Sequence, residues 1–212
     1  VTYNHCQSVV NVLTGTAPIA AAIRRNAGGD YDLLPANGDL TAAEVELLGA
    51  ANKERRLDAA LAEVRHHYDY VLIDCPPALS MLTVNALAAS DGVIIPMQCE
   101  YYALEGLSDL VNTIARIGRL LNPKLRVEGL LRTMYDPRSS LTNEVSNQLH
   151  KHFGSRVYRT VIPRNVRLAE APSHGQSVLS YARYSKGAVA YLGLAGEVLQ
   201  RQAGAASQGG AQ

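Results

Sequence analysis

The stretch from Tyr68 to Ala78, YDYVLIDCPPA, constrains the fold more than any other part of the chain. Its apolar run, Val71–Ile73, has no alternation between polar and apolar residues. Such a run predicts a strand that is buried on both faces, as strands inside parallel sheets are. Pro76 and Pro77 end this strand, because proline lacks the main-chain N–H that a central strand needs.

Asp74 follows the apolar run directly. Ligands of open parallel sheets bind beyond the carboxyl ends of the strands, so a carboxylate there is placed to hold a metal ion or to orient a water on a phosphate. A carboxylate at this point can equally cap the helix that follows. The residues alone leave both interpretations open.

Helical and extended patterns alternate along the rest of the chain. Leu57, Leu61 and Val64, for example, fall on one face of a helix. The patterns predict helices at 9–13, 19–24, 42–49, 53–66, 82–89, 104–121, 141–152 and 185–202, and strands at 31–34, 71–73, 92–97, 127–134 and 157–162. This alternation predicts an α/β fold with a mostly parallel sheet and helices on both faces.

Composition indicates one globular domain in a reducing compartment. With 212 residues, 47% of them hydrophobic and 18% charged, the chain can bury a core. We expect a single domain over residues 1–202 and a disordered, low-complexity tail over 203–212. No apolar run approaches the roughly 20 residues of a membrane span. Three cysteines, Cys6, Cys75 and Cys99, are too few for a disulfide framework, which favours bacterial cytoplasm.

Charge is unevenly spread along the sequence. Residues 1–115 carry 6 Lys/Arg and 14 Asp/Glu, a net charge of −8, and residues 116–212 carry 14 and 5, a net charge of +9. A basic half suggests a face that meets a polyanion, because Lys and Arg displace counterions from phosphates. Alternatively, the charges intermix on the folded surface.

Five segments together resemble the ParA family of partitioning ATPases, most closely its Soj-like branch. They are YDYVLIDCPP, which matches the Walker B segment, LLPANGDLTAAEVEL (33–47), GVIIPMQCEYYALEGL (92–107), LLRTMYDPRSSLTNEV (130–145) and VIPRNVRLAEAPSHGQSV (161–178). They occur in the family's order across nearly the whole chain. The resemblance implies a P-loop NTPase-like fold of the deviant Walker A type.

One part of the family's pattern is absent from the sequence. Family members begin with a strand, a KGGxGKT/S loop, a helix and a second strand whose aspartate positions the attacking water, but no GxxxxGK[ST] occurs here. We therefore expect either a fragment or a degenerate relative, without the N-terminal strand-loop-helix-strand. Because the missing strand is central in the family's sheet, we expect this chain alone to be poorly soluble or partly molten.

The resemblance assigns nucleotide-site residues one by one. Asp74 is implied as the acid of the Mg²⁺ shell, acting through water, and Pro163 and Asn165 in IPRN as contacts of adenine. ATP and Mg²⁺ are the cofactors that the resemblance implies for an intact family member. Whether this chain is an enzyme stays open, because it lacks the P-loop lysines and the water-positioning aspartate, and weak or no ATP binding is expected of it.

The resemblance also implies a DNA surface. Arg138 in TMYDPR and Arg167 in IPRNVR match arginines that bind DNA non-specifically in ATP-closed homodimers, with Arg164 and Lys186 as weaker candidates. Guanidinium groups suit phosphate contact. A nucleoid-associated partitioning ATPase, stimulated by a ParB-like partner and not bound to a membrane, is the function implied. The alternative is a non-catalytic DNA- or partner-binding module without ATP control.

Two remoter interpretations belong to relatives of the same family. Cys75 and Cys99 could hold an iron-sulfur cluster, as cysteines of the nitrogenase iron proteins do, but two cysteines without a CxxC pattern are more often small buried side chains. Membrane targeting of the MinD kind needs a C-terminal helix with basic and bulky apolar faces, and the tail has neither.

Overall fold

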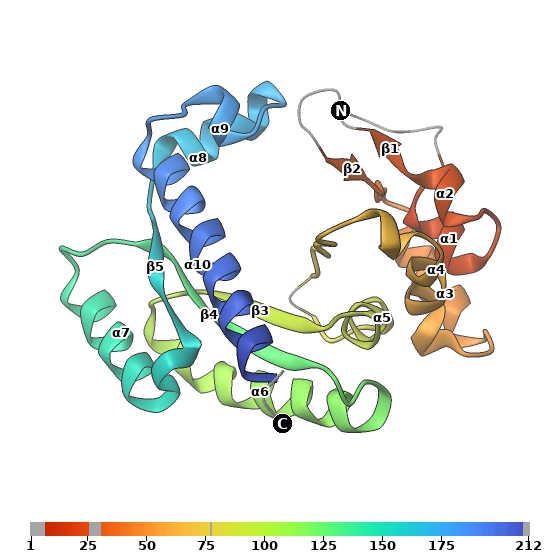
Figure 1. Ribbon diagram of the computed structural model, residues 1–212, viewed down its shortest axis with the longest axis horizontal. Helices are drawn as coiled ribbons and strands as arrows, with labels where there is room; N and C mark the ends of the chain where they lie inside the picture. Colours follow the sequence, from red (N-terminus) through yellow and green to blue (C-terminus); the bar gives the residue numbers. More distant parts are fainter. Residues whose placement is uncertain (1–6, 26–30, 77, 210–212) are drawn as a thin grey trace. The chain divides into compact units, whose positions relative to one another are not determined.

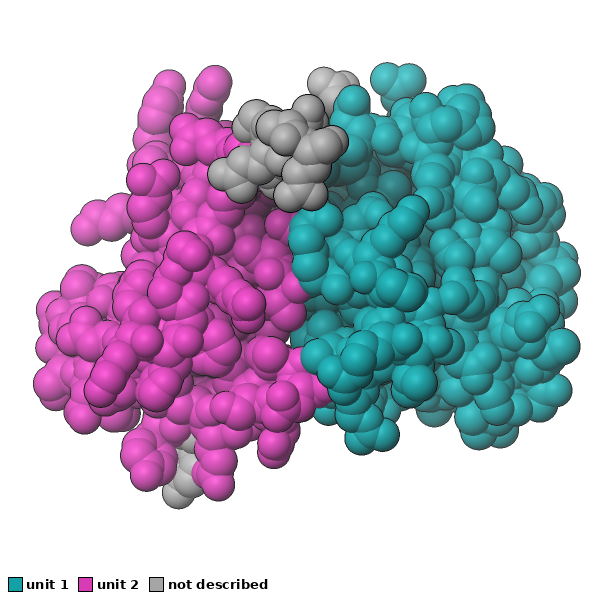
Figure 2. Space-filling model, turned by 60° about the horizontal axis from the view of Figure 1, so that its bottom comes forward, with its two compact units in different colours: residues 1–93, 113–126 teal, residues 94–112, 127–212 magenta. Residues whose placement is uncertain are grey.

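The computed structural model describes residues 7–25, 31–76 and 78–209, without the side chains of Tyr102 and residues 205–209. The chain divides into two compact units (Figure 2), residues 1–93 with 113–126 as unit 1 and residues 94–112 with 127–212 as unit 2. Strand β3 (Gly92–Gln98) and helix α6 (Tyr101–Leu121) contribute residues to both units. The single domain expected from the sequence stays a prediction.

Unit 1 is mainly helical (Figure 1). Its elements in the described residues are α1 (Val9–Thr14), α2 (Ile19–Ala22), β1 (Arg24–Arg25), β2 (Asp32–Leu33), α3 (Leu40–Leu48), the 3₁₀ turns η1 (Lys53–Arg55) and η2 (Arg65–His67), α4 (Arg56–Val64) and α5 (Met81–Ala89). β1 and β2 pair antiparallel. Each helix predicted in this part of the sequence is present, within a few residues of the expected bounds.

Local sequence explains these helices. Ser8 and Asn11 form a capping box at the start of α1, and Gly15 ends the helix with a φ of 77°, which glycine adopts without strain. The predicted face of α4 is buried, with Leu57, Leu61 and Val64 all at most 9% exposed. These three pack with apolar residues of α1, α2 and α3 into the core of unit 1.

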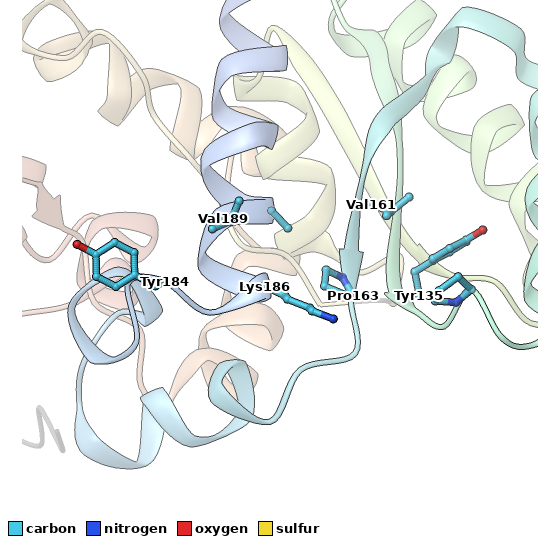
Figure 3. Close-up of a pocket in the computed structure, with 8 residues that line it drawn as sticks. Tyr135, Val161, Pro163, Tyr184, Lys186 and Val189 are labelled. Atoms are coloured by element: carbon cyan, nitrogen blue, oxygen red, sulfur yellow. The ribbon is translucent and has the colours of Figure 1, made fainter.

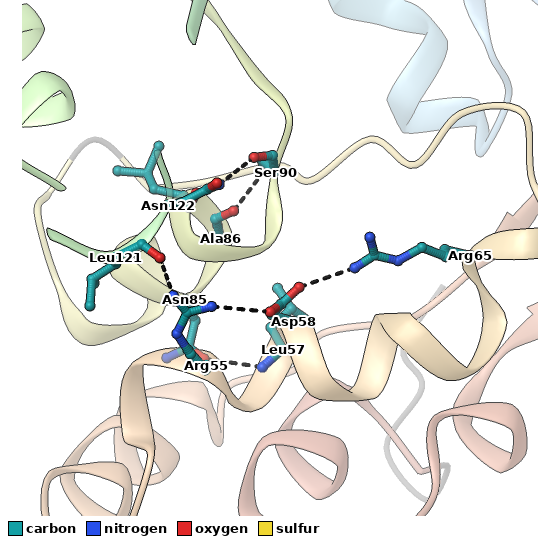
Figure 4. Close-up of polar contacts among 10 residues, drawn as sticks. Arg55, Leu57, Asp58, Arg65, Asn85, Ala86, Ser90, Leu121 and Asn122 are labelled. Atoms are coloured by element: carbon teal, nitrogen blue, oxygen red, sulfur yellow. Dashed lines mark hydrogen bonds and ion pairs between the residues drawn. The ribbon is translucent and has the colours of Figure 1, made fainter. Parts of the chain in front are cut away.

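Asn85 holds α5 against the segment that leads into α4. Its side chain is 1% exposed, and its Oδ1 accepts the main-chain N–H of Leu57 at 3.1 Å (Figure 4). Its Nδ2 donates to the carbonyls of Lys53 and Met81 at 2.7 and 3.0 Å. Asn122 donates to two carbonyls at the end of α5, at 3.0 and 2.6 Å. Both amides therefore bind main-chain groups, among them groups near helix ends that lack partners within the helix.

The central apolar run is not a strand in the structure, contrary to the prediction. Residues 71–76 lie outside both sheets, with Leu72 89% and Val71 45% exposed, whereas Ile73 packs against the core of unit 1. A strand needs neighbours that satisfy its main-chain groups, and in the described part of the chain no strand pairs with this run. The apolar pattern alone does not supply that neighbour.

Unit 2 contains the larger sheet, whose strand order is β3-β4-β5. β4 (Arg126–Tyr135) and β5 (Val157–Pro163) are parallel, with Leu130 opposite Val157 and Tyr135 opposite Pro163. The other elements are α7 (Ser140–Phe153), η3 (Gly154–Arg156), α8 (Val166–Glu170), η4 (Ala171–His174), α9 (Val178–Tyr181) and α10 (Lys186–Gly209). Parallel strands with helical connections confirm the predicted α/β class.

Helix α10 lies along β5 (Figure 1). The apolar contact joins Leu194 and Val198 of α10 to Tyr158 and Ile162 of β5. A carboxylate adds a polar contact, because Glu197 is 6% exposed and accepts the main-chain N–H groups of Arg159 and Thr160, each at 2.9 Å, and a bond from Arg201 at 2.8 Å. Glu197 thereby covers polar groups of a strand at the edge of the described sheet.

Arg132 is a buried cation of β4 that the sequence analysis did not single out. Its side chain, 7% exposed, donates to Ser146 Oγ at 2.8 Å and to the carbonyls of Tyr158 and Arg159 at 2.9 and 3.1 Å. These bonds tie together β4, α7 and β5. Its Nε has no hydrogen-bond partner among the residues that the structure describes.

The last helix is longer than expected. α10 continues beyond Gln202 to Gly209, and residues 210–212 of the expected disordered tail lie outside the described part. Ala203, Ala205 and Ala206 explain the extension, because alanine has the highest helix propensity. Low complexity alone therefore did not mark the end of the helix.

Candidate functional site

A pocket of about 530 Å³ lies in unit 2, where β4 and β5 end. Its volume is in the range of sites for small organic ligands. Figure 3 shows the side chains around it. The lining residues are Tyr135, Pro137, Val161, Pro163, Tyr184, Lys186, Val189 and Ala190. A mostly apolar wall with one ammonium group suits a flat organic ring that carries or adjoins polar atoms.

The parallel register of β4 and β5 builds the floor of this pocket. Tyr135 is the register partner of Pro163, and the main-chain N–H of Arg164 donates to the carbonyl of Tyr135 at 3.3 Å. The Tyr135 hydroxyl donates to Asn143 Oδ1 at 2.8 Å, which fixes the ring. The pocket therefore lies at the carboxyl ends of parallel strands, where ligands of open α/β sheets bind.

The structure brings two of the predicted site residues together at this pocket. Pro163, expected at a purine base, and Lys186, expected at DNA, both line it. Asn165 is not among the lining residues; it is the N-cap of α8, and its Oδ1 accepts the N–H of Arg167 at 2.9 Å. Tyr135 and Tyr184 were not predicted, although Tyr135 directly precedes the TMYD aspartate at the end of a predicted strand.

Asp74 belongs to unit 1, apart from the other predicted site residues, which all belong to unit 2. It is exposed in the extended segment 71–76. The sequence predicted that it follows the end of a strand, but the structure has no strand there. Burial, and then the charge of Asp74, raise the pKa of the neighbouring Cys75 thiol. Cys99 of unit 2 is 5% exposed, and burial raises the pKa of its thiol although the Arg132 charge opposes this.

Three arginines follow the carboxyl ends of β4 and β5. Arg138 is 88% exposed and pairs with Asp136, with 2.9 Å between Nη2 and Oδ2. Arg167 pairs with Glu170, with 2.8 Å between Nη1 and Oε2. Arg164 has no carboxylate within ion-pair distance in the described residues, but its charge contributes to the lowered pKa of Asp136. The predicted DNA-contact arginines therefore share one end of the sheet in unit 2.

None of the helices in the described residues is long and apolar enough to cross a membrane.

Comparison with known proteins places this chain in a family. Residues 1–127 match the family described as AAA domain. An uncharacterized protein of Pseudomonas putida is 65% identical over 195 residues, which are 92% of this chain and 74% of that protein. The sporulation initiation inhibitor protein Soj of Bacillus subtilis is 49% identical over 192 residues, 91% and 76% of the two chains.

Two further relatives extend the comparison. The chromosome partitioning protein ParA of Caulobacter vibrioides is 47% identical over 197 residues, 92% of this chain and 74% of that protein. Among solved structures, cobyrinic acid a,c-diamide synthase of Mycobacterium smegmatis, with a bound ATP analogue and magnesium, has a TM-score of 0.73 and 37% identity, covering 87% of this chain and 68% of that one. The family match and these relatives show that the chain is of the MinD/ParA-type P-loop ATPase class.

Within that class, the chain belongs to the ParA/Soj family of chromosome-partitioning ATPases.

Proposed function

We propose that this chain is part of a ParA/Soj-type partitioning ATPase whose ATP-bound homodimer binds DNA non-specifically on the nucleoid and is stimulated by a ParB-like partner. The observation that carries the proposal is the clustering, at one end of the β4-β5 sheet, of a pocket large enough for a small organic ligand and three arginines. The names of the Soj and ParA relatives support it.

In this proposal the pocket takes the adenine of ATP. Pro163 offers a flat apolar face to the base, and Tyr135 lies opposite Pro163 in the register. Asn165 is proposed to reach the base through its Nδ2, since its Oδ1 is used to cap α8. The bound ATP analogue and magnesium of the cobyrinic acid a,c-diamide synthase support ATP and Mg²⁺ as the cofactors. Asp74 is the proposed acid of the Mg²⁺ shell, through water.

Phosphate contact is the proposed role of the exposed arginines. Arg138, Arg164 and Arg167 are exposed, and a guanidinium group binds phosphate in a bidentate geometry that carries no base information. Non-specific binding is therefore the mode that these residues support. Lys186, assigned to DNA by resemblance, lines the pocket, which favours a role at the nucleotide.

The double variant Arg138→Ala with Arg167→Ala tests the DNA surface in the intact protein. With ATP and Mg²⁺ present, we expect it to lose retention on a fluorescent duplex of arbitrary sequence, and to lower the magnitude of the slope of log K against log salt by at most about 2, because two phosphate contacts are lost. Binding of a fluorescent ATP analogue should be unchanged. Arg65→Ala, which removes another exposed, ion-paired arginine from unit 1, is the matched control. Unchanged DNA affinity of the double variant at low salt would refute the proposed surface.

A non-catalytic DNA- or partner-binding module is the second candidate function. It would use the same exposed arginines at the end of the β4-β5 sheet without control by ATP. The two functions differ in one observable, because a module without ATP control binds DNA equally well with and without the nucleotide.

A further inference from the structure

Arg138 is held by a carboxylate two residues before it. Asp136 Oδ1 accepts from Arg138 Nε at 3.0 Å and from the Arg138 main-chain N–H at 3.1 Å, while Oδ2 accepts from Nη2 at 2.9 Å. The guanidinium fork is therefore occupied, although 88% of the side chain is exposed. Hydrogen bonds from Arg138 lower the pKa of Asp136 to about 2, so the carboxylate is ionised at neutral pH.

Arg167 is held in a similar way on α8. Its Nη1 donates to Glu170 Oε2 at 2.8 Å, and the Tyr181 hydroxyl donates to the same oxygen at 3.2 Å. The ring of His174 stacks on that of Tyr181, with 4.8 Å between centroids and 20° between planes. The carboxylate is thus fixed by contacts from α9 as well as by the arginine. The hydrogen bond that Arg167 donates to Glu170 raises the pKa of Arg167.

Asp136 and Glu170 are two of the few acidic residues in the carboxyl-terminal half of the sequence. Residues 116–212 contain only five Asp or Glu, namely Glu128, Asp136, Glu144, Glu170 and Glu197. Two of the five are placed on the two arginines that we assign to DNA. At this end of the sheet, two arginines are therefore ion-paired with carboxylates, and Arg164 is not within ion-pair distance of one in the described residues.

We propose that Asp136 and Glu170 are intramolecular competitors of DNA phosphate, which keep the DNA surface in a weakly binding state. This inference rests on the proposed DNA binding. A carboxylate and a phosphate accept the same bidentate bonds from a guanidinium group, so each can replace the other. DNA phosphate must displace Asp136 before it binds the Nε–Nη2 edge of Arg138, and Glu170 before it binds Arg167 Nη1, whereas Arg164 can contact phosphate first.

Competition of this kind has a specific consequence for salt dependence. A free arginine that contacts phosphate releases a condensed counterion from DNA, which steepens the fall of affinity with salt. When the arginine leaves a carboxylate instead, the carboxylate attracts a cation from solution. The net release of ions is then smaller, so this surface has a shallower salt slope than three unpaired arginines would give.

Asp136→Asn and Glu170→Gln test the proposal in the intact protein with ATP and Mg²⁺. Asn keeps an oxygen for the Arg138 main-chain N–H, and Gln keeps one for the Tyr181 hydroxyl. We expect each variant to bind a fluorescent DNA duplex about two- to fivefold more tightly, the fold-change that corresponds to an exposed ion pair. The salt slope should steepen by up to about 1 for each arginine released.

The control is Asp58→Asn, which removes the carboxylate paired with Arg55 and Arg65 in unit 1. It should change neither the DNA affinity nor the salt slope.

Two outcomes separate this inference from the function on which it rests. If Arg138→Ala with Arg167→Ala loses DNA binding while the carboxylate variants match the wild type in affinity and slope, the competition is refuted and the DNA surface stands. Weaker binding of a variant whose circular dichroism and melting temperature are unchanged would also refute it. If the double arginine variant binds DNA as the wild type does, the proposed surface fails, and the competition fails with it.

Discussion

Gly129, in β4, has no room for a side chain. A Cβ built on it would lie 2.6 Å from Tyr158 Cε2 and 2.7 Å from the carbonyl oxygen of Arg156. The second neighbour is main chain and cannot move aside without shifting β5. The close approach of β4 to its neighbours therefore requires glycine at this position.

Gly129→Ala should consequently destabilise unit 2 by about 1–3 kcal/mol, the usual cost of overpacking a close-packed site. Urea unfolding, followed by circular dichroism, would measure it. Gly106→Ala is the matched control, because nothing lies within 4 Å of the added methyl group on α6. There the substitution should stabilise by about 0.5–1 kcal/mol, from helix propensity. An equal effect at both positions would contradict the packing described for Gly129.

At the scale of elements, the contact of α10 with β5 depends on one ionised carboxylate. Burial by itself would raise the pKa of Glu197, but the N–H groups of Thr160 and Arg159 and the bond from Arg201 outweigh it and lower the pKa to about 2. Since the folded pKa lies below the unfolded value of 4.5, the stabilisation is fully present above about pH 4.5 and is lost as the pH falls towards 2. Its size is about 3 kcal/mol.

Glu197→Gln should flatten this pH dependence. We expect the variant to be about 1–3 kcal/mol less stable near neutral pH, because bonds to a charged group are lost, and to change less in stability between pH 4.5 and 2. Urea midpoints measured across that range would show it. Glu63→Gln, at an exposed position of α4, serves as the control. A variant that loses as much stability on acidification as the wild type would show that another group is responsible.

The extended segment 71–76 gives a second test at this scale. Because it joins neither sheet, the amides of Val71, Leu72 and Ile73 should exchange with deuterium orders of magnitude faster than those of Leu130 and Leu131 in β4. Hydrogen exchange with mass spectrometry of this chain measures both regions at once. Comparable protection would mean that the segment is paired as a strand after all.

The sequence correctly predicted elements that depend mainly on residues close together in the chain. The helix face of Leu57, Leu61 and Val64 is buried as expected, because neighbouring turns of one helix determine it. The strand at 71–73 was predicted wrongly for the opposite reason, since a strand depends on partners distant in sequence and the apolar run contains no information about them.

For the candidate site, too, the sequence located residues of a local motif but not those that depend on tertiary structure. Pro163, which the motif assigns to adenine, and Lys186, which it assigns to DNA, both line the pocket, and both assignments stay predictions. Asp136 and Glu170 were overlooked, although each lies within three residues of its arginine, because an ion pair depends on side-chain conformation as well as spacing. The register of β4 and β5, which brings Tyr135 to the pocket, is a tertiary property.

For the whole molecule, the two halves of the sequence differ strongly in net charge, but the two compact units do not. The halves of the sequence carry −8 and +9, but unit 1 carries 10 Lys/Arg and 11 Asp/Glu, a net charge of −1, and unit 2 carries 10 and 8, a net charge of +2. The charges therefore intermix, because α6 places acidic residues in unit 2 and basic ones in unit 1. DNA binding must then depend on the local arginines at the end of the sheet rather than on a strongly basic unit.

The most direct test of the proposed function is the affinity of the intact protein for a DNA duplex of arbitrary sequence, measured with and without ATP and Mg²⁺ at several salt concentrations. A ParA/Soj-type ATPase should bind tightly only with the nucleotide, and its affinity should fall linearly on logarithmic axes as salt rises. Equal affinity with and without ATP would contradict ATP control and favour the non-catalytic binding module. No binding under either condition would contradict the DNA surface itself.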